Sequence, residues 1–161
     1  MKWLFGLIVI AGLLLAGCPP PPEPTAVETA TTPPPELYDK TWISPGKVEI
    51  GNFYPGARAE YTLSIHNGSD EPVEFSVSYR VTDNTAEGYE PAPATAQAWV
   101  IIADPAPVLA AKETREVLIV LEIPGDAEVP PKWEFQIAVK DVTQTGMVQT
   151  ELACRWLVEM K

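Results

Sequence analysis

Histidine and cysteine are scarce in this chain of 161 residues, which holds one histidine and two cysteines. A histidine-rich metal site is therefore excluded, and a Ser-His-Asp triad would have to be built around His66. His66 lies on the polar side of an alternating segment, just before a turn, so we expect a solvated residue at a strand end. The acidic residues form no Asp-x-Asp-x-Asp-Gly calcium loop. The sequence predicts no catalytic residue, no metal and no cofactor.

Basic residues are also few, because 11 lysines and arginines stand against 22 aspartates and glutamates, for a net charge of −11. Such a chain has no basic patch with which to displace counterions from phosphates, so nucleic acid is excluded as a partner. An acidic surface is not attracted to anionic lipid either. Any membrane contact must therefore come from another source.

No apolar run is long enough to cross a bilayer. The longest, residues 3–15, has 13 residues and is interrupted only by two glycines. At about 1.5 Å of rise per residue it falls well short of a hydrocarbon core of about 30 Å. It follows Lys2 and leads into two small residues. A charged start, a short apolar run and a small-residue exit predict a helical export signal over residues 1–17.

The residues Leu15, Ala16, Gly17 and Cys18 form the pattern of a leucine, two small residues and a cysteine. This segment resembles the lipobox of bacterial lipoproteins. The resemblance implies cleavage before Cys18, a diacylglycerol thioether on its sulfur and a fatty acyl group such as palmitate on the new amino terminus. Two or three acyl chains anchor a protein stably, so we expect an extracytoplasmic lipoprotein of the cell membrane or outer membrane. The alternatives are an ordinary secretory signal and an uncleaved anchor.

Residues 19–40 differ in composition from the rest of the chain. They include eight prolines and almost no large apolar side chain before Leu37. Proline fixes φ and removes a backbone donor, so residues 18–40 are predicted to be a disordered, extended and unpacked tether. In polyproline II geometry, at about 3.1 Å per residue, the tether reaches on the order of 70 Å. The alternative is a linker that serves only solubility.

Residues 41–161 show an all-β pattern of short alternating runs separated by Pro, Gly, Asn and Asp. We expect seven principal strands, near residues 48–50, 61–66, 73–81, 99–102, 114–123, 133–140 and 147–160, with a short edge segment at 108–109. The second and third are expected to be neighbours joined by the connection at residues 67–72. Seven short strands in one small domain predict a seven-stranded antiparallel sandwich of two packed sheets.

This domain resembles immunoglobulin-like modules of bacterial surface and periplasmic proteins, including the type similar to the major sperm protein. The segments that carry the resemblance are WISPGKVEIG, YTLSIHNGSDEP and WVIIADPAPVLAAKETREVLIVLEIP. Such modules serve as adhesins, chaperones, spacers and subunits. The resemblance therefore implies an immunoglobulin-like fold and leaves the function open.

Three further features are candidates for a role. Cys154 alternates with Leu152 and Trp156, so a buried structural thiol is expected, without a disulfide partner if Cys18 carries lipid. The triplet at residues 67–69 matches an N-glycosylation acceptor that doubles as a turn.

The third candidate lies in the long connection TDNTAEGYEPAPATA, at Ala86 to Ala96, which holds Glu87, an exposed Tyr89 and Glu90. Long loops on a rigid sandwich often carry recognition, so these residues form a candidate partner-binding loop. The alternative is a flexible strand connection.

Together these features predict a non-enzymatic, lipid-anchored module of the cell envelope that binds a protein or glycan partner or has a structural role. A second hypothesis is an accessory subunit of a larger membrane complex that uses a sheet edge for strand addition. A third is an envelope enzyme with an unrecognised site.

The lipid anchor is tested by Cys18→Ser. Wild-type protein is expected to enter the detergent phase, with a mature mass that begins at a diacylated Cys18. The substitution removes the sulfur that carries the lipid, so it should abolish both processing and membrane binding. Phase partitioning and intact-mass spectrometry measure the two effects. A Cys18→Ser protein that is cut at the same site and stays membrane-bound would contradict the anchor.

Overall fold

The computed structural model describes residues 25–27, 37–144 and 150–161, and nearly all of its regular structure is β. The elements are β1 (Thr25–Val27), β2 (Trp42–Ser44), β3 (Lys47–Phe53), β4 (Arg58–His66), β5 (Val73–Arg80), β6 (Glu90–Pro91), the 3₁₀ helix η2 (Ala94–Trp99), β7 (Val100–Ile102), β8 (Val108–Leu109), β9 (Thr114–Glu122), β10 (Lys132–Asp141) and β11 (Glu151–Met160). Within these described stretches no helix has the length and apolar character needed to cross a membrane.

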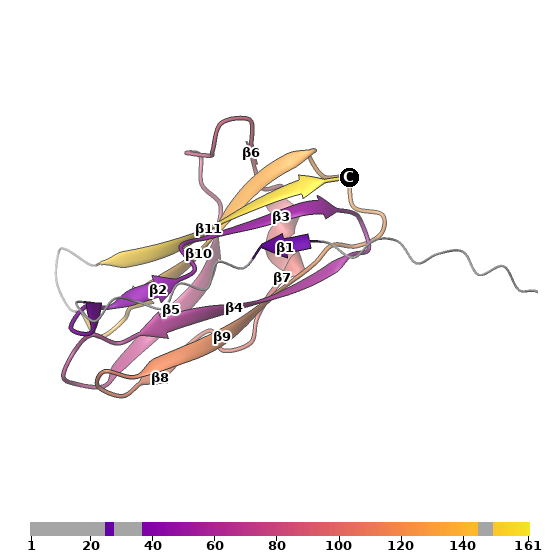
Figure 1. Ribbon diagram of the computed structural model, residues 1–161. Coiled ribbons are helices and arrows are strands. Elements are labelled where there is room, and N and C mark those ends of the chain that lie inside the picture. The colour runs from indigo at the N-terminus through magenta and orange to yellow at the C-terminus, as the bar shows by residue number, and fades with distance from the viewer. Residues whose placement is uncertain (1–24, 28–36, 145–149) are drawn as a thin grey trace, which may run out of the picture.

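The strands form two sheets that pack face to face (Figure 1). Sheet A has the order β1-β3-β11-β10-β5-β8, with β6 also paired to β10, and sheet B has the order β2-β4-β9-β7. Most pairs are antiparallel, but β3 runs parallel to β11 and β6 runs parallel to β10. The chain changes from sheet B to sheet A between β2 and β3. The predicted immunoglobulin-like sandwich is therefore the fold.

The seven predicted strands are present as β3, β4, β5, β7, β9, β10 and β11, and the predicted edge segment is β8. Their inward faces are also as predicted. In β10, for example, Trp133, Phe135 and Ile137 are fully buried. Strand β11 begins at Glu151, whereas residues 147–149 of the predicted strand lie outside the described residues.

The prediction that the second and third strands are neighbours is wrong, because β4 lies in sheet B and β5 in sheet A. The connection between them crosses the end of the sandwich instead of making a hairpin. Its Asn67 is fully buried, and Nδ2 donates to the carbonyl oxygens of Glu71 at 2.8 Å and Ala110 at 2.9 Å. These bonds hold the crossing in place and leave β5 to pair with β10 and β8.

Four short elements were not predicted: β1, β2, β6 and η2. The three strands have two or three residues each, too few to show an alternating pattern. Trp99 ends η2 instead of beginning a strand. Strand β1 pairs with β3, so the prediction of an unpacked tether is wrong for Thr25–Val27.

Aromatic side chains fill the space between the sheets. Trp156 of β11 stacks on Phe135 of β10, with ring centroids 5.2 Å apart. Tyr61 of β4, in the other sheet, meets Trp156 edge-on at 4.9 Å. Edge-to-face and offset aromatic pairs add to the stability that area burial supplies. This cluster therefore joins sheet A to sheet B near the middle of the molecule.

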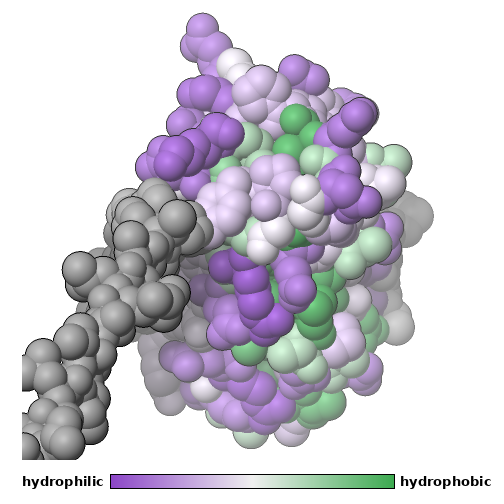
Figure 2. Space-filling model, turned by 90° about the vertical axis from the view of Figure 1, so that its right-hand side faces the viewer, coloured by the Kyte–Doolittle hydropathy of each residue, from purple (hydrophilic) through white to green (hydrophobic). Residues whose placement is uncertain are grey.

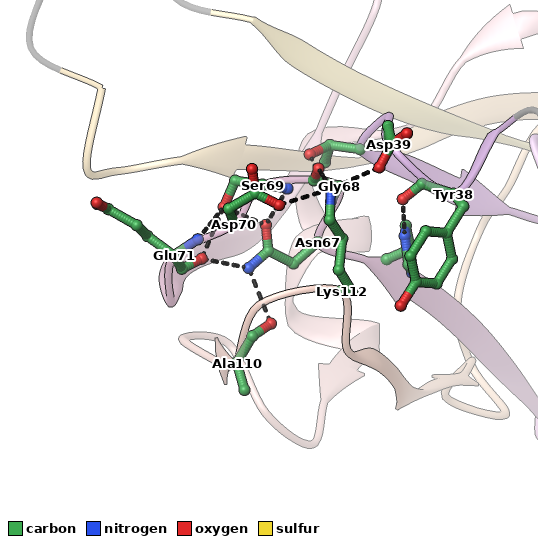
Figure 3. A network of polar contacts seen from close by, with 11 residues as sticks. Tyr38, Asp39, Asn67, Gly68, Ser69, Asp70, Glu71, Ala110 and Lys112 are labelled. Carbon is green, nitrogen blue, oxygen red and sulfur yellow. Dashed lines mark hydrogen bonds and ion pairs between the residues drawn. The ribbon is translucent and has the colours of Figure 1, made fainter.

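The residues before β2 are held against one end of the sandwich by a polar network (Figure 3). It comprises Tyr38, Asp39, His66, Gly68 and Lys112 and is called the exit network below. Lys112 Nζ donates to Asp39 Oδ1 at 2.8 Å and to the carbonyl oxygen of Gly68 at 2.6 Å. His66 contacts the carbonyl oxygen of Tyr38 at 2.8 Å. The last part of the predicted tether is thus fastened to the domain.

Gly68 allows this close approach, and its substitution tests the exit network. An added Cβ would lie 2.6 Å from Lys40 Cα, so Gly68→Ala should lower the unfolding free energy by about 2 kcal/mol through overpacking. Gly46 has nothing within 4 Å of the same position, which makes Gly46→Ala the matched control. Urea denaturation measures both variants. Equal stability of the two would show that Lys40 and Thr41 are not packed on Gly68.

Candidate partner-binding loop

The connection at residues 81–93 is ordered along sheet A. It leaves β5 at Arg80 and returns beside β10 as β6, with Trp133 opposite Glu90 and Glu134 opposite Pro91. The backbone N–H of Ala92 donates to the carbonyl oxygen of Glu134 at 2.9 Å. Figure 1 shows this loop at the top of the molecule, above β10 and β11. Backbone pairing thus attaches the end of this connection to β10.

A buried carboxylate fastens the loop to the sheet. The side chain of Glu134 is fully buried, and Arg155 of β11 donates to it through Nε at 2.7 Å and Nη2 at 2.9 Å. The N–H of Ala86, in the loop, donates to Glu134 Oε2 at 2.7 Å. A buried charge is tolerated when it is paired and its oxygens are hydrogen-bonded. Glu134 therefore ties two strands and the loop together.

The tip of the loop is a tight turn. The N–H of Tyr89 donates to the carbonyl oxygen of Ala86 at 3.0 Å, and Gly88 has a φ of 81°. A positive φ at the third position is characteristic of a type II turn and favours glycine. Thr85 Oγ1 donates to the carbonyl oxygen of Tyr89 at 2.8 Å and closes the base of the turn. Glu87 stands exposed at the tip.

Tyr89 is half-buried, which corrects the prediction of an exposed side chain. Its hydroxyl donates to Glu159 Oε1 at 2.8 Å, and Lys132 Nζ donates to the same oxygen at 2.7 Å. Lys132 Nζ also lies 5.6 Å from the centre of the Tyr89 ring. Burial, followed by the hydrogen bond to Glu159, raises the pKa of Tyr89 to about 12. Tyr89 thus anchors the loop, and its ring is only partly available to a partner.

The exposed surface of the loop is acidic. Asp83, Glu87 and Glu90 are all exposed, and residues 81–93 include no lysine or arginine. The top of the molecule, seen from the end where β3 and β11 finish, is mostly hydrophilic (Figure 2). Glu87 and Glu90, the two candidate glutamates, are therefore both accessible to a partner.

A separate open hollow of about 430 Å³ lies beside η2. It is lined by residues that include Trp99 and the half-exposed Ile101.

The other candidate residues have different outcomes. Cys154 is fully buried, as predicted, and burial raises its pKa to about 12. His66 is only 3% exposed, so the prediction of a solvated residue is wrong. Leu15, Ala16, Gly17 and Cys18 lie outside the described residues, and the lipid anchor stays a prediction. Among the residues that are described, no three His, Cys, Asp or Glu side chains gather as metal ligands would.

His66 is buried because two segments cover the end of β4. Trp42 of β2 stacks on the imidazole ring at 5.1 Å, and Nδ1 lies 2.9 Å from Thr114 Oγ1. The carbonyl oxygen of Tyr38 can only accept, so Nε2 carries the proton in that bond. His66 therefore holds structure together at the exit network.

Asn67 does not fit the role of a glycosylation acceptor. The side-chain nitrogen that would carry the sugar is engaged with carbonyl oxygens in the interior, and the residue is fully buried. The triplet at residues 67–69 serves the crossing between the sheets instead.

Glu134 and Arg155 were missed by the sequence reasoning. Alternation placed Glu134 on the polar side of its strand, where a solvated side chain is the usual outcome. The one feature of the sequence that could have indicated burial was the long connection after β5. The sequence did not show where this connection lies, whereas the structure places it against β10 beside Glu134.

The Glu134–Arg155 pair is tested by Arg155→Ala. Removing the guanidinium leaves a buried carboxylate whose remaining donor is the backbone N–H of Ala86, so the unfolding free energy should fall by about 2 kcal/mol. Amide exchange at Ala86 and Ala92 should also accelerate, since both amides bond to Glu134. Arg80→Ala is the control, because the Arg80–Glu151 pair is half-exposed and should contribute less than about 1 kcal/mol. Equal losses in the two variants would contradict the role of Glu134.

No family model matches the chain, and no curated protein matches it. Solved structures do match. A PapD-like domain of human CEP192 has 16% identity and a TM-score of 0.55, over 84% of this chain and 92% of that one. The E. coli chaperone DraB has 18% identity and a TM-score of 0.50, over 75% of this chain. A C. elegans MSP family member has 19% identity and a TM-score of 0.43, over 75% of this chain and 97% of that one.

These likenesses concern the fold. The matched part of this chain corresponds to 55% of the DraB chain, so it spans about half the length of that chaperone. At such identities the similarity lies in the arrangement of strands, and function depends on sites that the fold does not determine. The described chain is an immunoglobulin-like β-sandwich, similar in fold to the PapD-like domain and to the chaperone DraB.

Proposed function

We propose that this protein is a non-enzymatic, lipid-anchored module of the cell envelope that binds a protein partner through the loop at residues 81–93. The anchor rests on the lipobox pattern that ends at Cys18. The observation that carries the binding role is the fixed acidic loop, with Glu87 and Glu90 exposed and its base held by buried Glu134.

The rigidity of the loop favours recognition. A loop that is already ordered loses little conformational entropy when it binds, so more of the contact energy appears as affinity. The bonds from Ala86 and Tyr89 to the sheet supply this order. The exposed acids then favour a basic protein surface, because complementary charges raise the association rate and select the partner.

An accessory subunit of a larger membrane complex is the second candidate function. The observation that favours it is the pairing of β1 with β3, in which a short extended segment adds to the edge of sheet A. Capture from native membranes separates the two. A stoichiometric complex that persists at high salt supports the subunit, whereas a salt-sensitive partner supports recognition by the acidic loop.

The loop is tested by Glu87→Lys combined with Glu90→Lys. Both side chains are exposed, so the fold should persist while charge reversal abolishes capture of a basic partner. Glu71→Lys combined with Glu74→Lys is the matched control, with the same change of charge on exposed residues around the start of β5. Cross-linked capture from membranes, quantified against wild type, measures both. Equal capture by the two double variants would contradict the loop, and capture that survives protease but not glycosidase treatment would indicate a glycan.

A further inference from the structure

Strand β1 lies on the outer edge of β3 in sheet A (Figure 1). The two run antiparallel, with Thr25 opposite Gly51 and Val27 opposite Glu49. The added strand comes from the middle of the segment predicted to be an extended tether. The edge of β3 therefore accepts an extended segment from this chain.

The segment that pairs is the part of the tether best suited to pairing. Residues 25–32 contain no proline, whereas Pro24 precedes them and three prolines follow at 33–35. Proline cannot donate to a ladder of hydrogen bonds, so the flanking residues are poor strand formers. Thr and Val favour strands. The sequence therefore favours pairing within residues 25–32, and the pairing is found at residues 25–27.

The backbone of β3 shows which tether residues make the pairing. Gly46 accepts a hydrogen bond from the N–H of Arg155, so its carbonyl points toward β11. Backbone groups alternate in direction along a strand, and those of Glu49 and Gly51 therefore point the other way, toward β1. Their opposite residues are Val27 and Thr25. In an antiparallel ladder the N–H of Ala26 then faces away from β3.

Thr25 of β1 and Tyr38, which precedes β2, lie toward opposite ends of the sandwich. Thr25 pairs near the end of β3, where Phe53 lies beside Met160. The candidate loop is at the same end, because Tyr89 bonds to Glu159. Tyr38 is held by His66 at the other end. The ten residues of β11 span about 33 Å between these ends.

We propose that the edge of β3 is a docking site for the chain's own tether segment, and that docking decides which end of the sandwich lies nearer the membrane. The second part rests on the proposed lipid anchor at Cys18. With the segment docked, the chain reaches the domain at the end that carries the candidate loop. With the segment released, the exit network becomes the point of attachment and the loop is carried to the far end.

Docking also changes the reach of the tether. Seven residues separate Cys18 from Thr25 and twenty separate Cys18 from Tyr38. At about 3.1 Å per residue, these lengths of chain can reach at most about 20 Å and about 60 Å. The docked state holds the candidate loop close to the anchor. The released state extends the domain and turns the loop away from the membrane, where a partner can reach it.

The docking site is tested by amide hydrogen exchange on the full chain purified in detergent. Thr25→Pro combined with Val27→Pro removes both N–H groups that face β3, so exchange at Glu49 and Gly51 should accelerate by roughly tenfold or more. Ala26→Pro is the matched control, because it removes an N–H that faces away from β3. Unprotected Glu49 and Gly51 amides in the wild type, or equal acceleration in Ala26→Pro, would overturn the proposal. Protection that rises with protein concentration would also overturn it, by assigning the added strand to a second copy.

Orientation is tested on the same proteins in nanodiscs that contain a gadolinium-chelating lipid. Gly125 lies at the loop end, because its Cα is 3.7 Å from the Cβ position of Gly56, in the turn after β3. In the wild type, paramagnetic broadening should be stronger at Gly125 than at Lys112 in the exit network. The double proline variant should reverse this order, and an unchanged order would overturn the orientation effect. A protein that retains the protected amides but does not bind nanodiscs would contradict the lipid anchor and leave the docking site supported.

Discussion

The contact between aromatic side chains of the two sheets is the interaction on which the rest of the structure depends. Trp156 packs on Phe135 within sheet A and on Tyr61 of sheet B, so it joins the inner faces of the two sheets. Burying such large side chains supplies much of the driving force for folding. With the sheets fixed, the edges and connections acquire defined positions.

Two polar groups in the interior then hold the connections, one toward each end of the sandwich. Glu134 binds the loop at residues 81–93 near one end, and His66 binds the residues before β2 at the other. Glu134 and His66 lose their contact with water on burial. Each makes hydrogen bonds instead with a segment that is far away in the sequence. Because an unpaired buried polar group is costly, each group strongly favours the ordered state of its segment.

Sheet A carries the features with functional interest. Its strands β10 and β11 provide Glu134 and Arg155, which support the acidic loop, and its strand β3 accepts the tether segment. Sheet B provides half of the core and the end of β4 where the chain enters the domain. The proposed binding and docking sites are therefore on one sheet, and both are attached to strands that neighbour β11.

The sequence by itself determined the class of fold, the seven main strands and their inward faces. A strand exposes its two faces with a period of two, and the alternation of Tyr61 and Leu63 with polar neighbours shows that period directly. The burial of Cys154 followed from the same rule. The lipobox at Cys18 is likewise a local pattern, and the anchor that it predicts depends on chemistry outside the described residues.

Only the tertiary structure decided which strands are neighbours and which polar residues are buried. The period of two identifies the side of a strand but not what covers it, so Glu134 and His66 were both predicted to face solvent. Ala86 meets Glu134 and Thr114 meets His66 across 48 residues of chain in each case. The separation of β4 and β5 into different sheets depends equally on Asn67 reaching Ala110. Contacts between such distant segments form only when the whole sandwich closes, and no local pattern of residues encodes them.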